Sequence, residues 1–243
     1  MLIKSTHKNA TKEHQITDEK IYHGRREMLK NMGFLGAGTL LGSGANASVF
    51  DLFSSDEEQP LVFQRDNLTY KPEGQAPEEL TPELKIISHN NFYEFGAQKN
   101  QPAELSQGFK VDPWTLTISG EVEKPFTLDY DDLYSSFDLE ERIYRLRCVE
   151  AWSMVIPWIG FSLADLVKKA KPTSKANYLA FETLYDPEQM IGQRNRRLGG
   201  GINYPYLEGL RIDEAMNPLA LMSVGLYGKT LPPQNGAPIR LVV

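Results

Sequence analysis

The sequence contains a single cysteine, Cys148, in 243 residues. One cysteine cannot close an internal disulfide, and it cannot supply the thiolates of a Cys₄ zinc or iron–sulfur site. Three roles therefore stay open for Cys148. It can be a small buried apolar residue, a reactive thiol, or one thiolate ligand of a cofactor that is held mainly by other groups.

Histidine is nearly as scarce. Three of the four histidines lie in the first 47 residues, and only His89 follows them. A His-rich copper or zinc site is therefore hard to build, and a Ser-His-Asp hydrolase would depend on His89 alone. The sequence also lacks the C-x-x-C-H of covalent haem attachment, the phosphate-binding loop G-x-x-x-x-G-K-[ST] and a convincing G-x-G-x-x-G.

No apolar run near the amino terminus approaches the roughly 20 residues that a membrane-spanning helix needs. The weakly apolar residues 32–41 follow the pair Arg25-Arg26 and precede Ala45-Asn46-Ala47, an A-x-A cleavage signal. This order predicts a twin-arginine signal peptide over residues 1–47, and hence export of the folded protein to the periplasm. A basic amphipathic N-terminal segment is the alternative.

Positive charge is also in short supply. Residues 1–47 hold seven Lys or Arg and four Asp or Glu, which leaves 19 basic and 28 acidic residues in the remaining 196, a net charge of −9. Phosphate contacts need a basic surface, so nucleic acid is not expected as a partner. A chain of this length is sufficient for one domain with a substantial core.

The remaining residues divide into an irregular part and a patterned part. Residues 48–88 are rich in Pro, Glu, Asp and Gln and lack periodicity, which predicts an extended arm or linker. Beyond them, runs of alternating or continuous apolar residues predict strands at 114–118, 142–149, 177–184 and 239–243. Helices are predicted at 127–133 and from the N-cap Ser162 to residue 170, ahead of Pro172.

The predicted strands place two polar side chains in informative positions. Cys148 lies near the end of the 142–149 strand, on the same side as Tyr144 and Leu146, where a side chain can reach a ligand. Thr183 continues the apolar face of the 177–184 strand, so its hydroxyl needs a hydrogen-bond partner if it is buried.

Three segments together resemble one protein family. They are N-N-F-Y-E-F-G at residues 90–96, R-L-R-C-V-E-A-W-S at 145–153 and L-P-P-Q-N-G-A-P-I-R at 231–240. They are similar to the catalytic subunit of bacterial periplasmic protein-methionine-sulfoxide reductases of the MsrP (YedY) type, molybdenum enzymes of the sulfite oxidase superfamily. The similarity runs from about residue 88 to the last residue, and the predicted leader agrees with it.

The resemblance implies the fold and its extent. An α+β fold of the sulfite oxidase type is expected, with mixed β-sheets and short helices, and a molybdopterin-binding catalytic domain over residues 89–243. The family continues beyond the matching strand with a Trp-Lys-x-Gly-Phe-Lys-like segment. Since this sequence stops within an apolar β run, the domain is expected to be incomplete at its C-terminus, although some domains end on a terminal strand.

The resemblance also implies a cofactor and the residues that hold it. In this family one molybdopterin binds molybdenum through its dithiolene sulfurs, and one cysteine thiolate completes the protein's share of the ligands. By motif match that cysteine is Cys148, and a soft thiolate suits such a metal. Pterin contacts are implied for six residues: Asn90, Tyr93, Glu94, Thr183, Asn235 and Arg240. The guanidinium of Arg240 is suited to a bidentate grip on the terminal phosphate.

The implied reaction is repair of methionine sulfoxide in oxidised periplasmic proteins, by oxygen-atom transfer to molybdenum. Methionine sulfoxide is a reversible oxidation product, and its reduction restores an apolar side chain. The electrons are expected from a haem-containing membrane subunit of the MsrQ type that draws on quinone. Two alternatives remain at this stage. One is another sulfite oxidase-type reaction, either sulfite oxidation or the reduction of small S- or N-oxides. The other is a cofactor-free exported binding protein.

Overall fold

The computed structural model describes residues 63–74, 76 and 78–243. The predicted leader at 1–47 and the first part of the predicted arm lie outside these residues. In the described part of the chain, no helix is long and apolar enough to cross a membrane.

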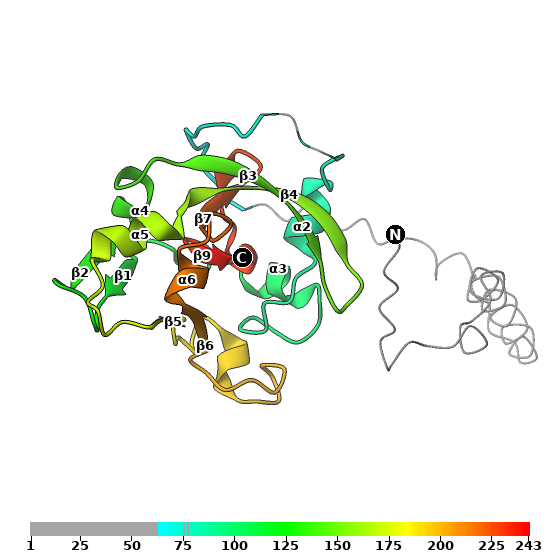
Figure 1. Ribbon diagram of the computed structural model, residues 1–243. Coiled ribbons are helices and arrows are strands. Elements are labelled where there is room, and N and C mark those ends of the chain that lie inside the picture. The colour runs from blue at the N-terminus through cyan, green and yellow to red at the C-terminus, as the bar shows by residue number, and fades with distance from the viewer. Residues whose placement is uncertain (1–62, 75, 77) are drawn as a thin grey trace, which may run out of the picture. The chain divides into compact units, whose positions relative to one another are not determined.

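A five-stranded sheet forms the middle of the domain. Strand β4 (Ser153–Ser162) lies between β3 (Glu140–Arg147) and β7 (Leu221–Leu226), and β7 also pairs with β8 (Lys229–Thr230) and β9 (Arg240–Val242). Figure 1 shows β3 and β4 as a long curved hairpin that reaches across the domain. The free end of this hairpin carries the turn that contains Cys148.

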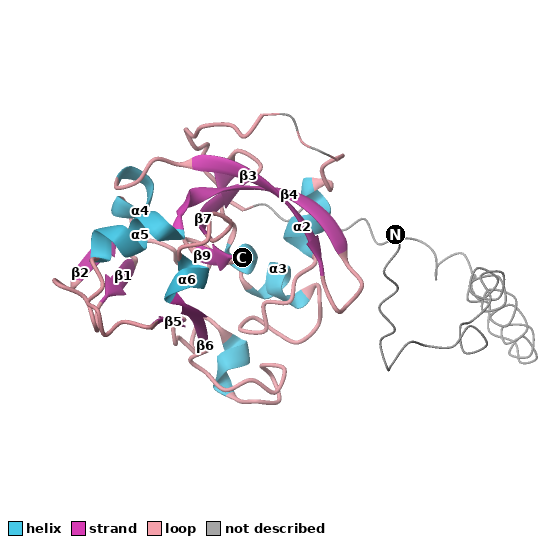
Figure 2. Ribbon diagram, viewed as in Figure 1, coloured by secondary structure: helices cyan, strands magenta, loops and turns pink. Residues whose placement is uncertain are grey.

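Two small sheets and several short helices surround the central sheet (Figure 2). Strand β1 (Thr115–Ile118) pairs with β2 (Phe126–Asp129), and β5 (Tyr178–Glu182) pairs with β6 (Leu207–Arg211). The helices are α2 (Glu83–Ser88), α3 (Gln101–Leu105), α4 (Asp132–Ser135), α5 (Leu163–Ala170) and α6 (Ile212–Ala215), with the 3₁₀ helices η3 (Ile191–Arg194) and η4 (Pro233–Asn235).

The α+β class with mixed sheets and short helices, predicted from the sequence, is confirmed. The pairings between the named strands are antiparallel. An isolated bridge between Lys71 and Glu140, at the outer edge of β3, is parallel.

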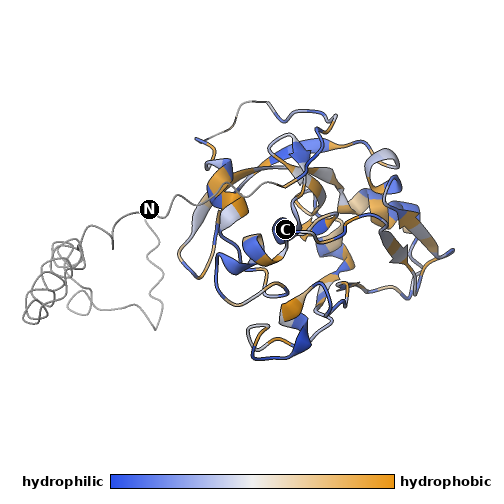
Figure 3. Ribbon diagram, turned by 180° about the vertical axis from the view of Figure 1, so that it is seen from behind, coloured by the Kyte–Doolittle hydropathy of each residue, from blue (hydrophilic) through white to orange (hydrophobic). Residues whose placement is uncertain are grey.

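Strand β4 serves two apolar clusters because alternate side chains of a strand face opposite sides of the sheet. Ile159 and Phe161 belong to the larger cluster, which also includes the buried face of α5. Ile156 and Trp158 belong to a second cluster, in which Ile86 of α2 takes part. In Figure 3 the apolar colour recurs along the central strands. The second cluster lies beneath the residues that the resemblance assigns to the cofactor.

The predicted strands at 114–118, 142–149, 177–184 and 239–243 correspond to β1, β3, β5 and β9. The helix predicted from Ser162 is α5, which ends where Lys171 takes a left-handed φ of 49°.

The helix predicted at 127–133 is wrong in its first half, where the chain forms β2. The main-chain N–H of Asp132 donates to the Asp129 carboxylate at 2.9 Å, and the N–H of Asp129 donates to the Asp132 carboxylate at 3.1 Å. These reciprocal bonds turn the chain from strand to helix, so the acidic residues mark a turn followed by a helix start.

The described part of the predicted arm, residues 63–88, is attached to the central sheet. The side chain of Arg65 is 6% exposed, and its guanidinium donates to the carbonyls of Thr230 at 2.5 Å and Leu226 at 2.7 Å. The segment also contains α2, which the sequence analysis did not predict. Proline and acidic residues around α2 obscure its helical periodicity, and burial of its apolar side against the second cluster stabilises it.

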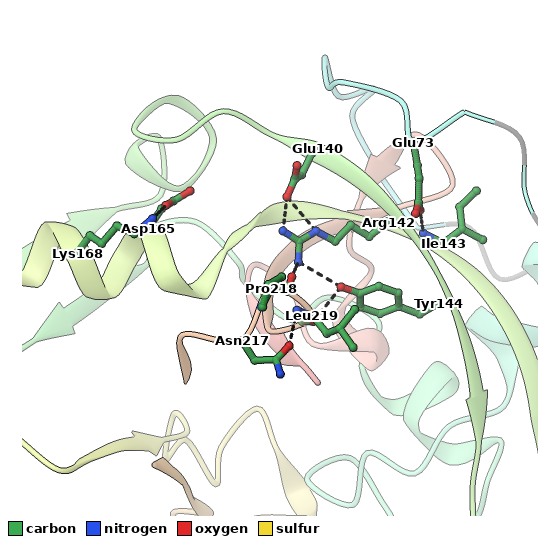
Figure 4. Close-up of polar contacts among 10 residues, drawn as sticks. All are labelled: Glu73, Glu140, Arg142, Ile143, Tyr144, Asp165, Lys168, Asn217, Pro218 and Leu219. Atoms are coloured by element: carbon green, nitrogen blue, oxygen red, sulfur yellow. Dashed lines mark hydrogen bonds and ion pairs between the residues drawn. The ribbon is translucent and has the colours of Figure 1, made fainter. Parts of the chain in front are cut away.

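Polar side chains fix β3 to the connection that leads into β7 (Figure 4). The Nε of Arg142 donates to Glu140 at 2.9 Å, and its terminal nitrogen donates to the carbonyl of Pro218. The hydroxyl of Tyr144 donates to the carbonyl of Leu219 at 2.8 Å. Strand β3 is therefore fixed both by its pairing with β4 and by side-chain hydrogen bonds to residues 218 and 219. These contacts precede the Cys148 turn in the chain.

Candidate cofactor site

Cys148 directly follows β3, in the turn that joins β3 to β4, whereas the sequence analysis placed it inside the strand, near its end. Its N–H donates to the carbonyl of Trp152 at 3.2 Å, and the N–H of Ala151 donates back to the carbonyl of Cys148 at 3.0 Å. Ala151 has a φ of 63°, which is costly for a residue with a Cβ and which closes this tight turn. The thiol is half-buried, whereas the adjacent Val149 is 97% exposed. The turn thus brings the only cysteine to the surface of the domain.

A polar network connects the Cys148 turn to the loop that follows α2. The Glu150 carboxylate, two residues beyond Cys148 in the same turn, accepts from the Asn91 amide at 2.7 Å. The ammonium of Lys99 donates to the Asn91 side-chain oxygen and, at 3.2 Å, to the hydroxyl of Tyr93. The nearby Cys148 thiol has the largest effect in lowering the pKa of Glu150, followed by the backbone of Glu150 itself, Asn91 and Lys99. Glu150 is therefore ionised at neutral pH.

Lys99 is the residue that joins the two sides of this network. Its ammonium lies 5.1 Å from the centroid of the Tyr93 ring and 5.7 Å from that of Trp152, within the range of cation–π attraction. Its carbonyl accepts from the N–H of Asn90 at 2.8 Å. The sequence analysis did not select Lys99, Asn91 or Glu150 as site residues. Asn91 and Glu150 lie inside the matching motifs, but no sequence signal marks Lys99.

Asn90 and Asn235, from distant parts of the sequence, meet at the carboxyl end of α2. Their amide nitrogens donate to the same carbonyl, that of Ile86, at 3.0 Å and 3.2 Å. Both side chains are buried, and both amide oxygens lack a hydrogen-bond partner. Because the shared carbonyl requires the NH₂ groups, these orientations leave the oxygens as the unpaired atoms. Two buried acceptors without partners indicate a missing donor.

Tyr93 and Glu94 are positioned by close packing against η3. The N–H of Gly192 donates to the carbonyl of Glu94 at 2.7 Å. A Cβ at Gly192 would lie 1.9 Å from the carbonyl oxygen of Tyr93, and a Cβ at Gly200 would meet the Tyr93 ring at 3.0 Å. Glycine at 192 thus allows η3 to contact the backbone of this loop directly.

The carboxyl group of Glu94 is buried without a counter-ion. Glu94 is 7% exposed, and no cation among the described residues lies within ion-pair distance of it. Desolvation by burial raises its pKa. Burial and then the nearby Glu94 and Tyr93 also raise the pKa of Tyr204 to about 12.

This burial predicts a pH-dependent stability. The pKa of Glu94 is higher in the folded than in the unfolded state. The contribution of this carboxyl to the free energy of unfolding is therefore fully present below its unfolded pKa of 4.5, and it is lost as the pH rises through the pKa of the folded state. Glu94→Gln is therefore expected to raise the thermal midpoint at neutral pH and to have little effect in acid. Thermal unfolding at several pH values measures this. The exposed Glu182→Gln is the control, and an equal shift of the Glu94 variant at every pH would contradict the prediction.

Arg240 presents a positive charge that the described residues do not neutralise. Its guanidinium donates to the carbonyls of Asn235 at 3.2 Å and Leu241 at 3.4 Å, and its central carbon lies 5.0 Å from the centroid of the Trp158 ring. No carboxylate in the described part of the chain pairs with it. Arg240 as a residue is solvent-exposed, whereas burial of its guanidinium lowers the pKa of that group, so an anion would approach it from the exposed side.

Thr183 lies one residue beyond β5 and is half-buried. Its N–H donates to the carbonyl of Tyr206, and its hydroxyl oxygen accepts from the N–H of Tyr206, both at 3.1 Å. The hydroxyl hydrogen therefore remains available for another acceptor. The buried Gln193 of η3 donates to the carbonyl of Leu184 at 2.7 Å, which ties this strand end to the element that packs on Tyr93 and Glu94.

The structure therefore brings most of the predicted site residues into one connected region. Asn90 and Asn235 share an acceptor, and Arg240 bonds to the backbone of Asn235. The turn that contains Cys148 is joined to the same loop by the hydrogen bond between Glu150 and Asn91. Thr183 belongs to this region less directly, through η3. The cofactor roles of these residues remain predictions.

A model of a known protein family matches residues 103–243, which is more than half of the chain, with the description "Oxidoreductase molybdopterin binding domain". The chain belongs to this family. The match establishes an oxidoreductase domain with a Mo-molybdopterin cofactor, and it includes Cys148, Thr183, Asn235 and Arg240. Asn90, Tyr93 and Glu94 precede the matched residues.

Among solved structures, the sulfane dehydrogenase SoxCD from Paracoccus pantotrophus is similar, with 13% sequence identity and a TM-score of 0.45. The similarity covers 74% of this chain and 46% of that one, so the chain spans less than half the length of this structural relative.

The residues of the site fit the family's cofactor. The unpaired amide oxygens of Asn90 and Asn235 can accept from ring N–H groups of a pterin, and the free charge of Arg240 suits a phosphate. Cys148 supplies a soft donor at an accessible position. Different residues are thus suited to the three parts of the cofactor: the two asparagines to the pterin ring, Arg240 to the phosphate and Cys148 to the metal.

Proposed function

We propose that this protein is a periplasmic molybdopterin-dependent reductase that repairs methionine sulfoxide in exported proteins. The three matching motifs and the twin-arginine leader support this choice within the family. The observation that carries it is the position of Cys148. The half-buried thiol lies in a turn whose neighbouring residues Val149 and Glu150 are exposed. An open site of this kind can receive a methionine side chain that is still attached to a protein.

The overall reaction consumes two electrons and two protons for each methionine sulfoxide and yields methionine and water. When bound, Mo-molybdopterin supplies the oxygen-atom-transfer and electron-storage chemistry. The electrons are proposed to come from a haem-containing membrane subunit that draws on quinone. The twin-arginine leader would deliver the folded protein to the compartment where oxidised periplasmic proteins are found.

Different residues of this chain would bind different parts of Mo-molybdopterin. Cys148 would bind the metal through its thiolate. Asn90 and Asn235 would accept hydrogen bonds from the pterin through their unpaired oxygens, and Arg240 would bind the phosphate. Tyr93, Glu94 and Thr183 would complete the pterin contacts, with the Thr183 hydroxyl as a donor.

Lys99 and Asn91 would maintain the orientation of the Cys148 turn relative to the pterin loop. Their bonds connect the Glu150 carboxylate on the turn to the Tyr93 hydroxyl on the loop. A shift of either segment would separate the metal ligand from the pterin contacts, and misplacement of reacting groups lowers rates strongly.

The experiment that tests this function compares substrates on one preparation of the enzyme. With a reduced dye as electron donor, we expect turnover of an oxidised, methionine-rich protein and no reaction with the same protein in its unoxidised form. Sulfite oxidation is measured in parallel with an electron acceptor, together with the reduction of small S- and N-oxides. Turnover of sulfite without turnover of oxidised protein would overturn the repair function. Folded, exported protein without molybdenum would instead support the binding-protein alternative.

A further inference from the structure

The indole ring of Trp158 is buried and lies against the guanidinium of Arg240, the candidate phosphate-binding residue. Trp158 is 6% exposed and lies in β4, opposite Arg142 of β3 and Leu226 of β7. It packs in the second apolar cluster with residues from α2, β7 and the loop before β9. Since both neighbouring strands and this cluster surround it, the ring has little freedom to move.

The guanidinium of Arg240 is held over this ring by neutral groups. The central carbon lies 5.0 Å from the ring centroid, and the two hydrogen bonds of the group go to the main-chain carbonyls of Asn235 and Leu241. Gly236, with a φ of +98°, leaves room for the side chain, because a Cβ there would lie 2.9 Å from the Arg240 Cβ. These contacts orient the guanidinium without cancelling its charge.

This arrangement differs from that of two other fixed arginines of the domain. Arg142 and Arg65 are also held by carbonyl groups, but each pairs with a carboxylate as well, Glu140 and Glu83 respectively. Those two charges are satisfied within the protein and serve the fold. An aromatic ring attracts a cation but leaves its outward N–H groups unoccupied, so Arg240 can still bind an anion in a bidentate way.

We infer that Trp158 is a positioning residue for the cofactor. It presets the Arg240 guanidinium, through cation–π attraction, in the orientation that receives the terminal phosphate of molybdopterin. The inference rests on the proposed assignment of Arg240 to that phosphate. A long arginine side chain loses rotamer freedom when it binds a ligand, and presetting it reduces that loss.

A double-mutant cycle tests the coupling between the two residues. The variants are Trp158→Leu, Arg240→Ala and the pair of them, and the measurement is the rate of pterin and molybdenum release from the purified protein. We expect Arg240→Ala to accelerate release, and Trp158→Leu to accelerate it about tenfold, as expected from the loss of one cation–π contact. In the Arg240→Ala background, Trp158→Leu is expected to have no further effect. Thermal midpoints of all variants are recorded, because the packing loss should be equal in both backgrounds.

Two further variants separate positioning from packing. Trp158→Phe keeps an aromatic face in a fully folded protein, and we expect release at a rate between those of the wild type and Trp158→Leu. Trp114→Leu removes a half-buried tryptophan from the other apolar cluster and is expected to leave release unchanged. If Trp158→Leu or Trp158→Phe accelerates release equally with and without Arg240, the ring acts through packing and the inference is wrong. If Arg240→Ala leaves release unchanged, the phosphate assignment fails and the inference fails with it.

Discussion

Cys148→Ser is expected to abolish turnover of oxidised protein and to deplete molybdenum. A serine hydroxyl is almost un-ionised at neutral pH and is not a soft sulfur donor, so it is a poor substitute for a thiolate ligand of molybdenum. The loss should exceed about 100-fold, because mutation of outer-shell partners alone costs 10–100-fold in metal sites. Steady-state rates and molybdenum content per polypeptide are the measurements.

The control for this substitution lies in the same turn. Val149 is 97% exposed, so Val149→Ser adds a hydroxyl next to Cys148 without removing a buried contact. We expect its activity, molybdenum content and thermal midpoint to be close to those of the wild type. Full activity of Cys148→Ser with bound molybdenum would show that the thiolate is not a ligand.

Gly192→Ala is expected to have the second large effect, because it acts on the backbone of the pterin loop. The new Cβ would lie 1.9 Å from the Tyr93 carbonyl oxygen and 2.8 Å from that of Glu94, and main-chain atoms cannot rotate away. Either η3 or the loop must shift, which breaks the 2.7 Å bond from Gly192 to Glu94. We expect loss of bound pterin together with a destabilisation of about 1–3 kcal/mol, the usual range for overpacking.

Gly209→Ala provides the matched control for this change. Gly209 is in β6, and a Cβ there would meet only the Leu179 carbonyl oxygen, at an ordinary contact distance of 3.8 Å. The same substitution should therefore change the free energy of unfolding by no more than about 0.5 kcal/mol. Pterin content and urea unfolding of both variants measure the difference. Normal pterin content in Gly192→Ala would show that the close contact does not position the loop.

Local pattern was sufficient to predict the regular elements with strong periodicity. The alternation over 114–118 and the apolar spacing after Ser162 correspond to β1 and α5. Prediction failed where tertiary contacts override local preference. The 127–133 segment has acidic residues that suit a helix start, but pairing with β1 makes its first half a strand. The six-residue α2 is too short to be stable alone, and it forms because Ile86 is buried in the second cluster.

The candidate site divides in the same way. Motif resemblance selected Cys148, Asn90 and Asn235, and the structure places Asn90 and Asn235 on one carbonyl and joins the Cys148 turn to the same loop. Lys99 and Trp158 could not be assigned from the sequence, because an isolated lysine or tryptophan has many ordinary roles. Their significance depends on rings and charges that come from other parts of the chain.

The sequence by itself determined the chemistry that is available: one thiol, little histidine, an excess of acidic residues and three motifs, two of which lie within the matched molybdopterin-binding domain. These properties depend on residue identity and order, which need no coordinates. Only the tertiary structure decided which groups are left without partners. In the described part of the chain, two amide oxygens lack a hydrogen-bond partner and one guanidinium lacks a carboxylate, because α2, β4 and the loop before β9 come together from distant parts of the sequence. Unsatisfied hydrogen bonds and uncompensated charge are properties of packing, and they are the observations that support the proposed cofactor site.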